Sequence, residues 1–198
     1  GSFKRVFLGY DLDKTERVAW VQMRGKAHNS EITQRLENEI NILKNIKHEN
    51  IVDLITSWYD SRGGQNAILE YLEYSLQDVK EVMQMRKIDP VHHAGYLHDE
   101  VVPQILSALI KLNQEIIVHR DIKPDNIGIS IDGKIKIMDF SEATLYSNDE
   151  PKRLLSIDET REINPKGSVW YMPPESFASI YYSTSDVYSL GITILELL

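Results

Sequence analysis

Residues 119–126 read His-Arg-Asp-Ile-Lys-Pro-Asp-Asn and bring three kinds of polar side chain close together in the chain. Asp121 supplies a carboxylate, Lys123 an ammonium group and Asn126 an amide oxygen. Transfer of a γ-phosphoryl group needs a carboxylate that orients the attacking hydroxyl, a cation near the developing charge and an oxygen ligand for a metal ion. The spacing therefore predicts a phosphoryl-transfer site with Asp121 and Lys123 as catalytic residues.

A second oxygen ligand follows at Asp139. The residues between Asn126 and Asp139 read as a hairpin, and Asp132-Gly133 predicts a type I′ turn at its tip. This hairpin would bring Asp139 opposite Asn126. Mg²⁺ retains several waters and takes only one or two protein carboxylates or amides beside phosphate oxygens. We therefore expect Asn126 and Asp139 to be the metal ligands.

Together with residues 167–175 and 186–191, these residues resemble the catalytic half of a eukaryotic protein kinase in type, order and spacing. The resemblance implies ATP and Mg²⁺ as cofactors. It also implies an α+β, bilobal fold, with a small antiparallel β lobe plus one helix and a larger, mainly helical lobe. One kinase-like domain would cover 1–198, with the small lobe and hinge in 1–72 and part of the large lobe in 73–198. Compared with the family, the domain would lack its first strand and the end of the large lobe.

Several elements must position these groups. Residues 1–23 read as a β-hairpin, and residues 51–59 and 67–72 as further strands. Apolar residues recur at helical spacing across 29–47, which predicts a helix. Helices are also expected over 75–86 and 99–113. By resemblance, His119 would pack with Phe140 rather than act as a base.

The phosphate-binding cation is not at its usual place. Kinases carry it at the end of Val-Ala-Ile-Lys, whereas residues 18–21 here read Val-Ala-Trp-Val. Val21 cannot bind phosphate. Residues 1–4 read Gly-Ser-Phe-Lys, and this pair of segments resembles the with-no-lysine (WNK) Ser/Thr kinases. The resemblance makes Lys4 the catalytic lysine and Glu39 its helix partner, while the simpler alternative is an exposed strand lysine.

The same resemblance implies a nucleotide site. The backbone of the hinge, at Glu70 and Leu72, would contact adenine, and Gly128 stands where most kinases have a large apolar residue beneath the base. That change would forfeit packing area. The nucleotide-binding residues implied are Gly1, Val6, Ala19, Glu39, Glu70, Leu72 and Gly128.

Substrate docking and regulation are also implied by family position. Ser168 lies where Ser/Thr kinases place a hydroxyl near the catalytic residues, so Ser or Thr is the expected acceptor in a protein substrate. Arg120 could pair with a phosphate on Ser156 or Thr160, added by an upstream kinase or by autophosphorylation.

Composition restricts the remaining possibilities. A net charge of −8 argues against a nucleic-acid partner, and the apolar stretch 190–198 is too short to span a membrane. A cytoplasmic location is expected. Three departures from the kinase pattern, Val21, Gly128 and Ser141, keep a second hypothesis open. This alternative is a pseudokinase that acts as a signalling scaffold with little or no phosphotransfer.

Overall fold

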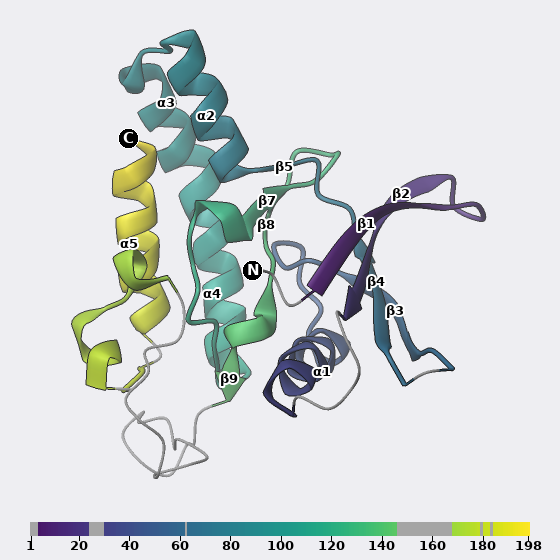
Figure 1. Cartoon of the computed structure of the whole chain (residues 1–198). Helices are drawn as coiled ribbons and strands as arrows, with labels where there is room; N and C mark the ends of the chain where they lie inside the picture. The colour runs from purple at the N-terminus through teal and green to yellow at the C-terminus, as the bar shows by residue number, and fades with distance from the viewer. Residues whose placement is uncertain (1–3, 24–29, 62, 146–167, 179, 183) are drawn as a thin grey trace.

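The computed structural model describes residues 4–23, 30–61, 63–145, 168–178, 180–182 and 184–198. Its smaller part is an antiparallel sheet with strand order β1-β2-β4-β3, accompanied by one helix (Figure 1). Along the chain these elements are β1 (Lys4–Asp11), β2 (Glu16–Met23), α1 (Ser30–Asn45), β3 (Leu54–Tyr59) and β4 (Gln65–Glu70). The expected hairpin, helix and two further strands are therefore confirmed.

The larger part is mainly helical and lies on the other side of α1 from the sheet (Figure 1). It also carries two small antiparallel sheets, β5-β7-β8 and β6-β9. Its elements are β5 (Tyr74–Ser75), α2 (Leu76–Arg86), α3 (Pro90–Tyr96), a π turn (Leu97–Val101), α4 (Val102–Gln114), β6 (Ile117–Val118), a 3-10 helix (Pro124–Asn126), β7 (Ile127–Ile129), β8 (Ile135–Ile137), a 3-10 helix (Phe140–Glu142), β9 (Thr144–Leu145), 3-10 helices (Val169–Tyr171 and Pro174–Ala178) and α5 (Ser185–Leu197). This is the α+β, bilobal arrangement expected.

The start of the helix expected over 99–113 was wrong in detail. The helix expected over 99–113 begins as the π turn Leu97–Val101 and becomes an α-helix only from Val102, next to Pro103. Proline lacks the N–H that would continue a regular hydrogen-bond ladder, which fits a change of helix type there. The α2 helix starts where expected, because Ser75 and Asp78 cap each other's backbone N–H groups.

The β7–β8 hairpin does not have the predicted type I′ turn. Gly133 is left-handed at φ 82°, but Asp132 is not. The N–H of Gly133 donates to the carbonyl of Ser130 at 2.9 Å, and Ser130 N–H donates to Lys134 at 3.0 Å. This is a three-residue loop in which one left-handed glycine follows a tight turn. Asp132 accepts a hydrogen bond from the Ser130 hydroxyl, so its side chain stabilises the turn.

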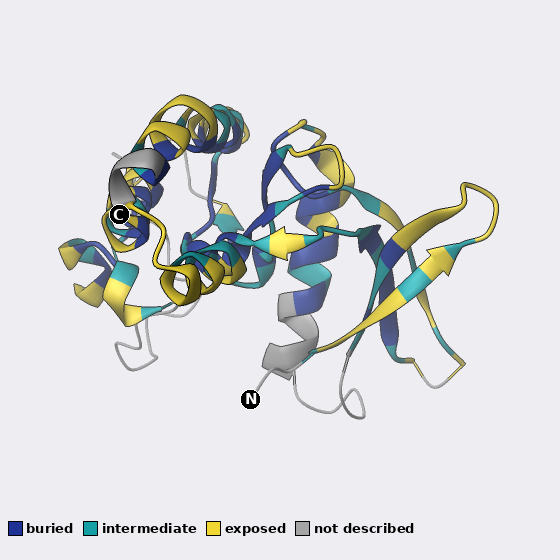
Figure 2. Cartoon of the chain, turned by 90° about the horizontal axis from the view of Figure 1, so that it is seen from above, coloured by how far each residue is buried: buried dark blue, intermediate teal, exposed yellow. Residues whose placement is uncertain are grey.

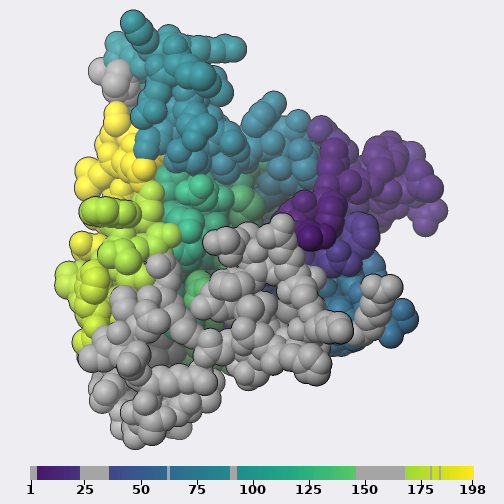
Figure 3. Space-filling model, in the orientation of Figure 1, coloured from purple at the N-terminus to yellow at the C-terminus, as the bar shows by residue number. Residues whose placement is uncertain are grey.

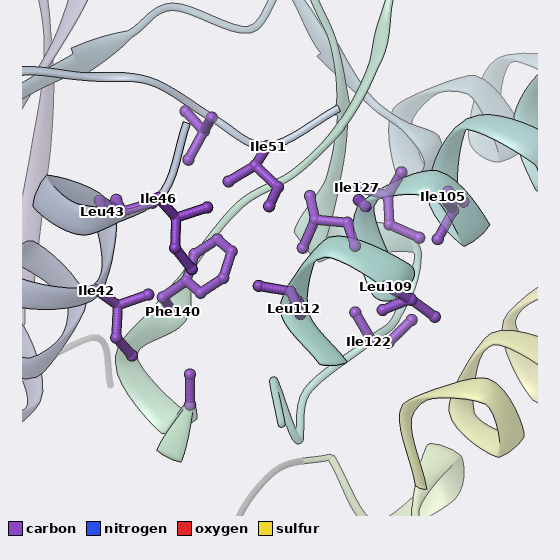
Figure 4. Packing of buried hydrophobic residues seen from close by; sticks show 14 of the residues in the cluster. Ile42, Leu43, Ile46, Ile51, Ile105, Leu109, Leu112, Ile122, Ile127 and Phe140 are labelled. Atoms are coloured by element: carbon purple, nitrogen blue, oxygen red, sulfur yellow. The ribbon is translucent and has the colours of Figure 1, made fainter. Parts of the chain in front are cut away.

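One hydrophobic core runs from the small lobe into the large one. Phe140, fully buried, lies between Ile42 of α1 and Ile46, which follows α1, on one side and Leu112 of α4 on the other (Figure 4). Helix α1 contacts both the sheet and the 3-10 helix that contains Phe140. Because fully burying one such side chain stabilises by about 1.5–3 kcal/mol, this shared core couples the position of α1 to the segment that follows Asp139.

Burial is uneven over the molecule. The β1–β2 hairpin is largely exposed toward its tip (Figure 2), whereas β4 is mostly buried. In the space-filling view the N-terminal strands project from one side and the C-terminal helix lies at the opposite side (Figure 3). Among the described residues, no helix is both long and apolar enough to cross a membrane.

Candidate functional site

The loop that carries Asp121 is fixed by a buried carboxylate on α5. Asp186 accepts hydrogen bonds from the backbone N–H groups of His119 at 2.7 Å and Arg120 at 2.9 Å. Arg120 is left-handed, with φ of 68°, a conformation that costs energy for a residue with a side chain. Burial raises the pKa of Asp186, while His119 and Arg120 oppose that shift. The two hydrogen bonds therefore compensate both the strained backbone and the buried carboxylate.

His119 is a packing residue, as expected. Its side chain is fully buried, and its ring meets that of Phe140 edge-on at 4.8 Å between centroids. Its Nε2 lies 3.2 Å from the carbonyl oxygen of Met138. Leu43 of α1 belongs to the same core, and Leu54 packs against it. These contacts join the loop before Asp121 to the segment before Asp139.

Asp121 is the centre of a polar cluster that also contains the side chains of Lys123, Asn126 and Ser168. Its Oδ2 accepts from Lys123 Nζ at 2.8 Å and from Asn126 Nδ2 at 2.7 Å. Its Oδ1 accepts from the backbone N–H of Ser168 at 2.8 Å. Lys123 Nζ also donates to Ser168 Oγ at 2.7 Å. Lys123 thus bridges the Asp121 carboxylate and the Ser168 hydroxyl, which by resemblance lies at the acceptor side.

Asn126 and Asp139, the two expected metal ligands, lie on neighbouring backbone segments. Both hydrogen bonds from the Asn126 side chain to Asp121 use its amide nitrogen, so its amide oxygen is the atom that could bind a cation. The backbone carbonyl of Asn126 accepts from Met138 N–H at 2.9 Å, which brings Asn126 next to the residue before Asp139. One amide oxygen and one carboxylate match what Mg²⁺ takes from proteins beside phosphates.

Lys4 lies between two carboxylates. Its Nζ is 2.9 Å from Glu39 Oε2 and 2.8 Å from Asp139 Oδ1. Glu39 is buried on α1, and its Oε1 also accepts from Phe140 N–H at 3.3 Å. The side chain of Lys4 is only 20% exposed. The alternative of an exposed strand lysine is therefore excluded for this structure.

The register of the hairpin explains how Lys4 reaches this position. Val6 pairs with Val21, and Leu8 pairs with Ala19. Cross-strand partners share one face of a sheet, and so do alternate residues along a strand. Lys4 and Val6 therefore share a face with Val21. A long side chain at position 4 can then occupy the space beside the buried Val21.

The three charged groups perturb one another. Burial lowers the pKa of Lys4, but the charges of Glu39 and Asp139 and its hydrogen bonds to them outweigh burial and raise it overall. Burial raises the pKa of Glu39, with the Lys4 ammonium opposing. Burial likewise acts to raise the pKa of Asp139, yet the charge and hydrogen bond of Lys4 prevail and lower it to about 2. Lys4 and Asp139 are thus held as a cation and an anion at neutral pH.

The nucleotide-binding residues implied by resemblance are only partly brought together. Ala19 is half-buried and Val6 is 60% exposed, on the shared hairpin face. The Glu70 carboxylate accepts from the buried Lys136 at 2.8 Å and from Asp53 N–H at 3.2 Å, which fixes the start of the hinge. The Leu72 side chain lies against Gly128. Gly1 lies outside the described residues.

The regulatory residues cannot all be placed. Ser156 and Thr160 lie outside the described residues. The Arg120 guanidinium donates through Nε to the carbonyl of Glu142 at 2.5 Å and stacks on the ring of Tyr181 at 5.2 Å. Arg120 therefore contacts Glu142, which precedes Ser156 and Thr160 in the chain.

Two groups in the site were not predicted. Asn38, on α1 immediately before Glu39, donates to the carbonyl of Ala143 at 2.6 Å. Arg17 makes a two-pronged ion pair with Glu73 and stacks on the ring of Tyr71, so it holds the hinge to β2. The sequence alone does not indicate that Arg17 and Glu73 form an ion pair, because they are far apart in the chain and the strand pairing that brings them together is not known from it. For Asn38, the sequence offered one indication of a role in the site, which was its position next to Glu39 on the predicted helix.

Ser141 proves compatible with its position. Glycine would be required there if the backbone were left-handed, but among the described non-glycine residues Ser141 is not one of those with positive φ. Its N–H lies 3.4 Å from Asp139 Oδ1. This substitution therefore gives no structural argument against catalysis.

The chain is similar in sequence to known protein kinases. A family model described as "Protein kinase domain" matches residues 1–198. "MAP3K epsilon protein kinase 2" of Arabidopsis thaliana is 30% identical over 199 residues, and "Serine/threonine-protein kinase WNK4" of Homo sapiens is 29% identical over 210. A "Probable serine/threonine-protein kinase" of Dictyostelium discoideum is 33% identical over 203 residues. Each comparison covers 100% of this chain, which spans only 14%, 15% and 37% of these relatives respectively.

Proposed function

Because this chain belongs to the protein kinase family, we propose that it transfers the γ-phosphoryl group of ATP to Ser or Thr hydroxyls of protein substrates. We further propose that Lys4 is the phosphate-binding lysine. The observation that carries the proposal is the position of the Lys4 ammonium, within 3 Å of both Glu39 and Asp139. A lysine paired in this way is charged and held in one orientation, as a phosphate-binding cation must be.

Each residue of the Asp121 cluster has a definite part in the proposed reaction. Asp121 would accept a hydrogen bond from the substrate hydroxyl and orient it for attack. Lys123 would stabilise the charge on the transferred group and, through Ser168, hold the acceptor side in place. The preorganised hydrogen bonds matter because groups that need not rearrange stabilise a transition state best.

Asn126 and Asp139 would hold the metal. Bound Mg²⁺ supplies neutralisation of the phosphate oxygens. Asp139 carries its charge at neutral pH because Lys4 lowers its pKa to about 2. Asn126 is oriented by its bonds to Asp121, so the metal ligand and the group that orients the hydroxyl form one unit.

A Ser or Thr acceptor is favoured by the position of Ser168. Ser168 contacts both Asp121 and Lys123 directly, and it stands at the position where Ser/Thr kinases carry a hydroxyl beside these two residues. The substrate would be a protein segment, and with a net charge of −8 a basic segment would be attracted rather than repelled. A cytoplasmic location and control by an upstream kinase or by autophosphorylation belong to the same proposal.

One observation supports the alternative that the protein is a scaffold. Val21 is buried where kinases normally carry their lysine, so a protein that lacked phosphotransfer could retain this fold. The two hypotheses differ in what the Asp121 cluster does. A scaffold needs the cluster only for folding.

The test is phosphate transfer from radiolabelled ATP to a basic Ser/Thr protein substrate, measured for the full-length protein that contains this chain. Wild type is compared with Asp121→Asn and with Asp13→Asn, an exposed aspartate in the β1–β2 turn. The proposal expects Asp121→Asn to lose at least about 10²-fold in rate and Asp13→Asn to match wild type. Equal rates for wild type and Asp121→Asn, or no transfer by wild type, would favour the scaffold.

A further inference from the structure

The structure has an unusually close approach at Gly128, in the strand β7. A Cβ atom built on this glycine would lie 2.4 Å from Leu72 Cδ1, 2.9 Å from Leu72 Cβ and 3.2 Å from Leu72 Cγ. Contacts between carbon atoms are favourable only near 3.5–4.0 Å. No side chain larger than hydrogen therefore fits at position 128 while Leu72 keeps its place.

The path of the hinge explains this approach. After Leu72, the N–H of Glu73 donates to the carbonyl of Ile129 at 2.7 Å. Next, β5 pairs with β7, with Ser75 opposite Gly128. The hinge thus continues into a strand that lies directly beside β7 (Figure 1). Leu72 is carried over the backbone of Gly128 as a consequence.

Leu72 fills the space rather than leaving it open. It is half-buried and packs against the main core. Gly128 itself is buried. Atoms of the hinge therefore occupy the space that a side chain at position 128 would fill.

We infer that Leu72 is the residue that determines how the base of the nucleotide is bound, by supplying from the hinge the apolar surface that position 128 supplies in most kinases. Gly128 is then the partner that leaves room for it. This inference rests on the proposed function, because it assigns a part of the same ATP site. It predicts that positions 72 and 128 behave as a single unit, in which one leucine and one glycine are required.

A reciprocal exchange tests the packing in the protein without nucleotide. Gly128→Leu should lower the melting temperature, because the new side chain meets Leu72. The exchange variant Leu72→Gly/Gly128→Leu contains the same residues as wild type and should recover most of that loss. Gly95→Ala is the matched control, because a Cβ added there would meet no described atom within 4 Å outside its own helix backbone and chain neighbours. Tolerance of Gly128→Leu, or an exchange variant no more stable than Gly128→Leu, would overturn the inference.

Binding of Mg²⁺-ATP, measured by calorimetry, tests the role in the site. Leu72→Ala should weaken binding about tenfold, as expected when roughly two methylene groups lose contact with the ligand. Leu106→Ala, which removes the same atoms from a partly exposed site on α4, should leave the affinity unchanged.

The outcomes separate the two proposals. If wild type binds Mg²⁺-ATP and Leu72→Ala binds it equally well, the role of Leu72 is refuted while the proposed function stands. If wild type binds no Mg²⁺-ATP, the proposed function and this inference are both refuted.

Discussion

The hydrogen bond from Asn38 to Ala143 predicts a large effect from a small change. Asn38→Ala removes a 2.6 Å bond that joins α1 to the segment after Asp139. Glu39, the next residue, bonds to Phe140 N–H in the same segment. The two bonds together fix the helix position at which Glu39 meets Lys4. Loss of the first should therefore let Glu39 withdraw from Lys4.

The magnitude follows from burial. A typical protein hydrogen bond contributes about 0.5–1.5 kcal/mol net, and a buried carbonyl left without a donor costs about 1–3 kcal/mol. Ala143 is only 2% exposed, so we expect a cost of about 2 kcal/mol. If this cost destabilises the active position of α1 and not its alternatives, the population of the active position falls by roughly 30-fold relative to them. We therefore expect kcat/KM to fall by at least about tenfold.

The assay is the initial rate of phosphate transfer at varied ATP. Asn45→Ala is the matched control, since the Asn45 side chain lies on the same helix and, among the described residues, donates to Asn41 of that helix at 2.8 Å. Asn38→Ala is also combined with Glu39→Gln. If Asn38 acts through Glu39, its loss should cost much less in the Glu39→Gln background. Equal rates for Asn38→Ala and Asn45→Ala, or fully additive losses, would refute this reasoning.

Three other predictions concern charge. Because the pKa of Asp139 is about 2 in the folded protein against an ordinary 3.8, its ionised form adds stability above about pH 4 that is lost as pH falls toward 2. The stability difference between wild type and Asp139→Asn, measured by urea unfolding, should shrink over that range, and a constant difference would contradict this. The resemblance to the with-no-lysine kinases implies that Glu142 takes the place of an apolar residue beside a bound chloride. Because a carboxylate repels an anion, exchange of chloride for gluconate at constant ionic strength should leave the rate unchanged, and marked chloride inhibition would refute this prediction. Finally, a phosphate on Ser156 or Thr160 would pair with Arg120, so phosphatase treatment should lower activity. Full activity of phosphate-free protein would show that this regulation by phosphorylation does not operate.

Much of the fold could be predicted because its signals are local. The apolar spacing of α1 and the two apolar runs of β1 and β2, separated by a polar connection, each indicate an element without reference to the rest of the chain. The register of β1 and β2 places Lys4 on the face of Val21. The prediction that Lys4 takes the part of the usual lysine came from the resemblance to the with-no-lysine kinases.

The parts that were missed depend on contacts between distant segments. The approach of Leu72 to Gly128 arises from the pairing of β5 with β7, which no local pattern specifies. The bond from Asn38 to Ala143 spans 105 residues. The turn at Gly133 was misjudged because Asp-Gly is compatible with more than one hairpin loop, and the Ser130 hydroxyl favoured the other form.

The central claim is that Lys4 serves as the phosphate-binding lysine, and the rate of Lys4→Met tests it most directly. Phosphate transfer at saturating Mg²⁺-ATP is compared among wild type, Lys4→Met, Val21→Ala and Lys14→Met, the last at an exposed lysine of the same hairpin. Removal of a preorganised cation from the transferred phosphate should cost at least about 10²-fold. Val21→Ala and Lys14→Met should remain largely active. A Lys4→Met variant as fast as wild type would contradict the account.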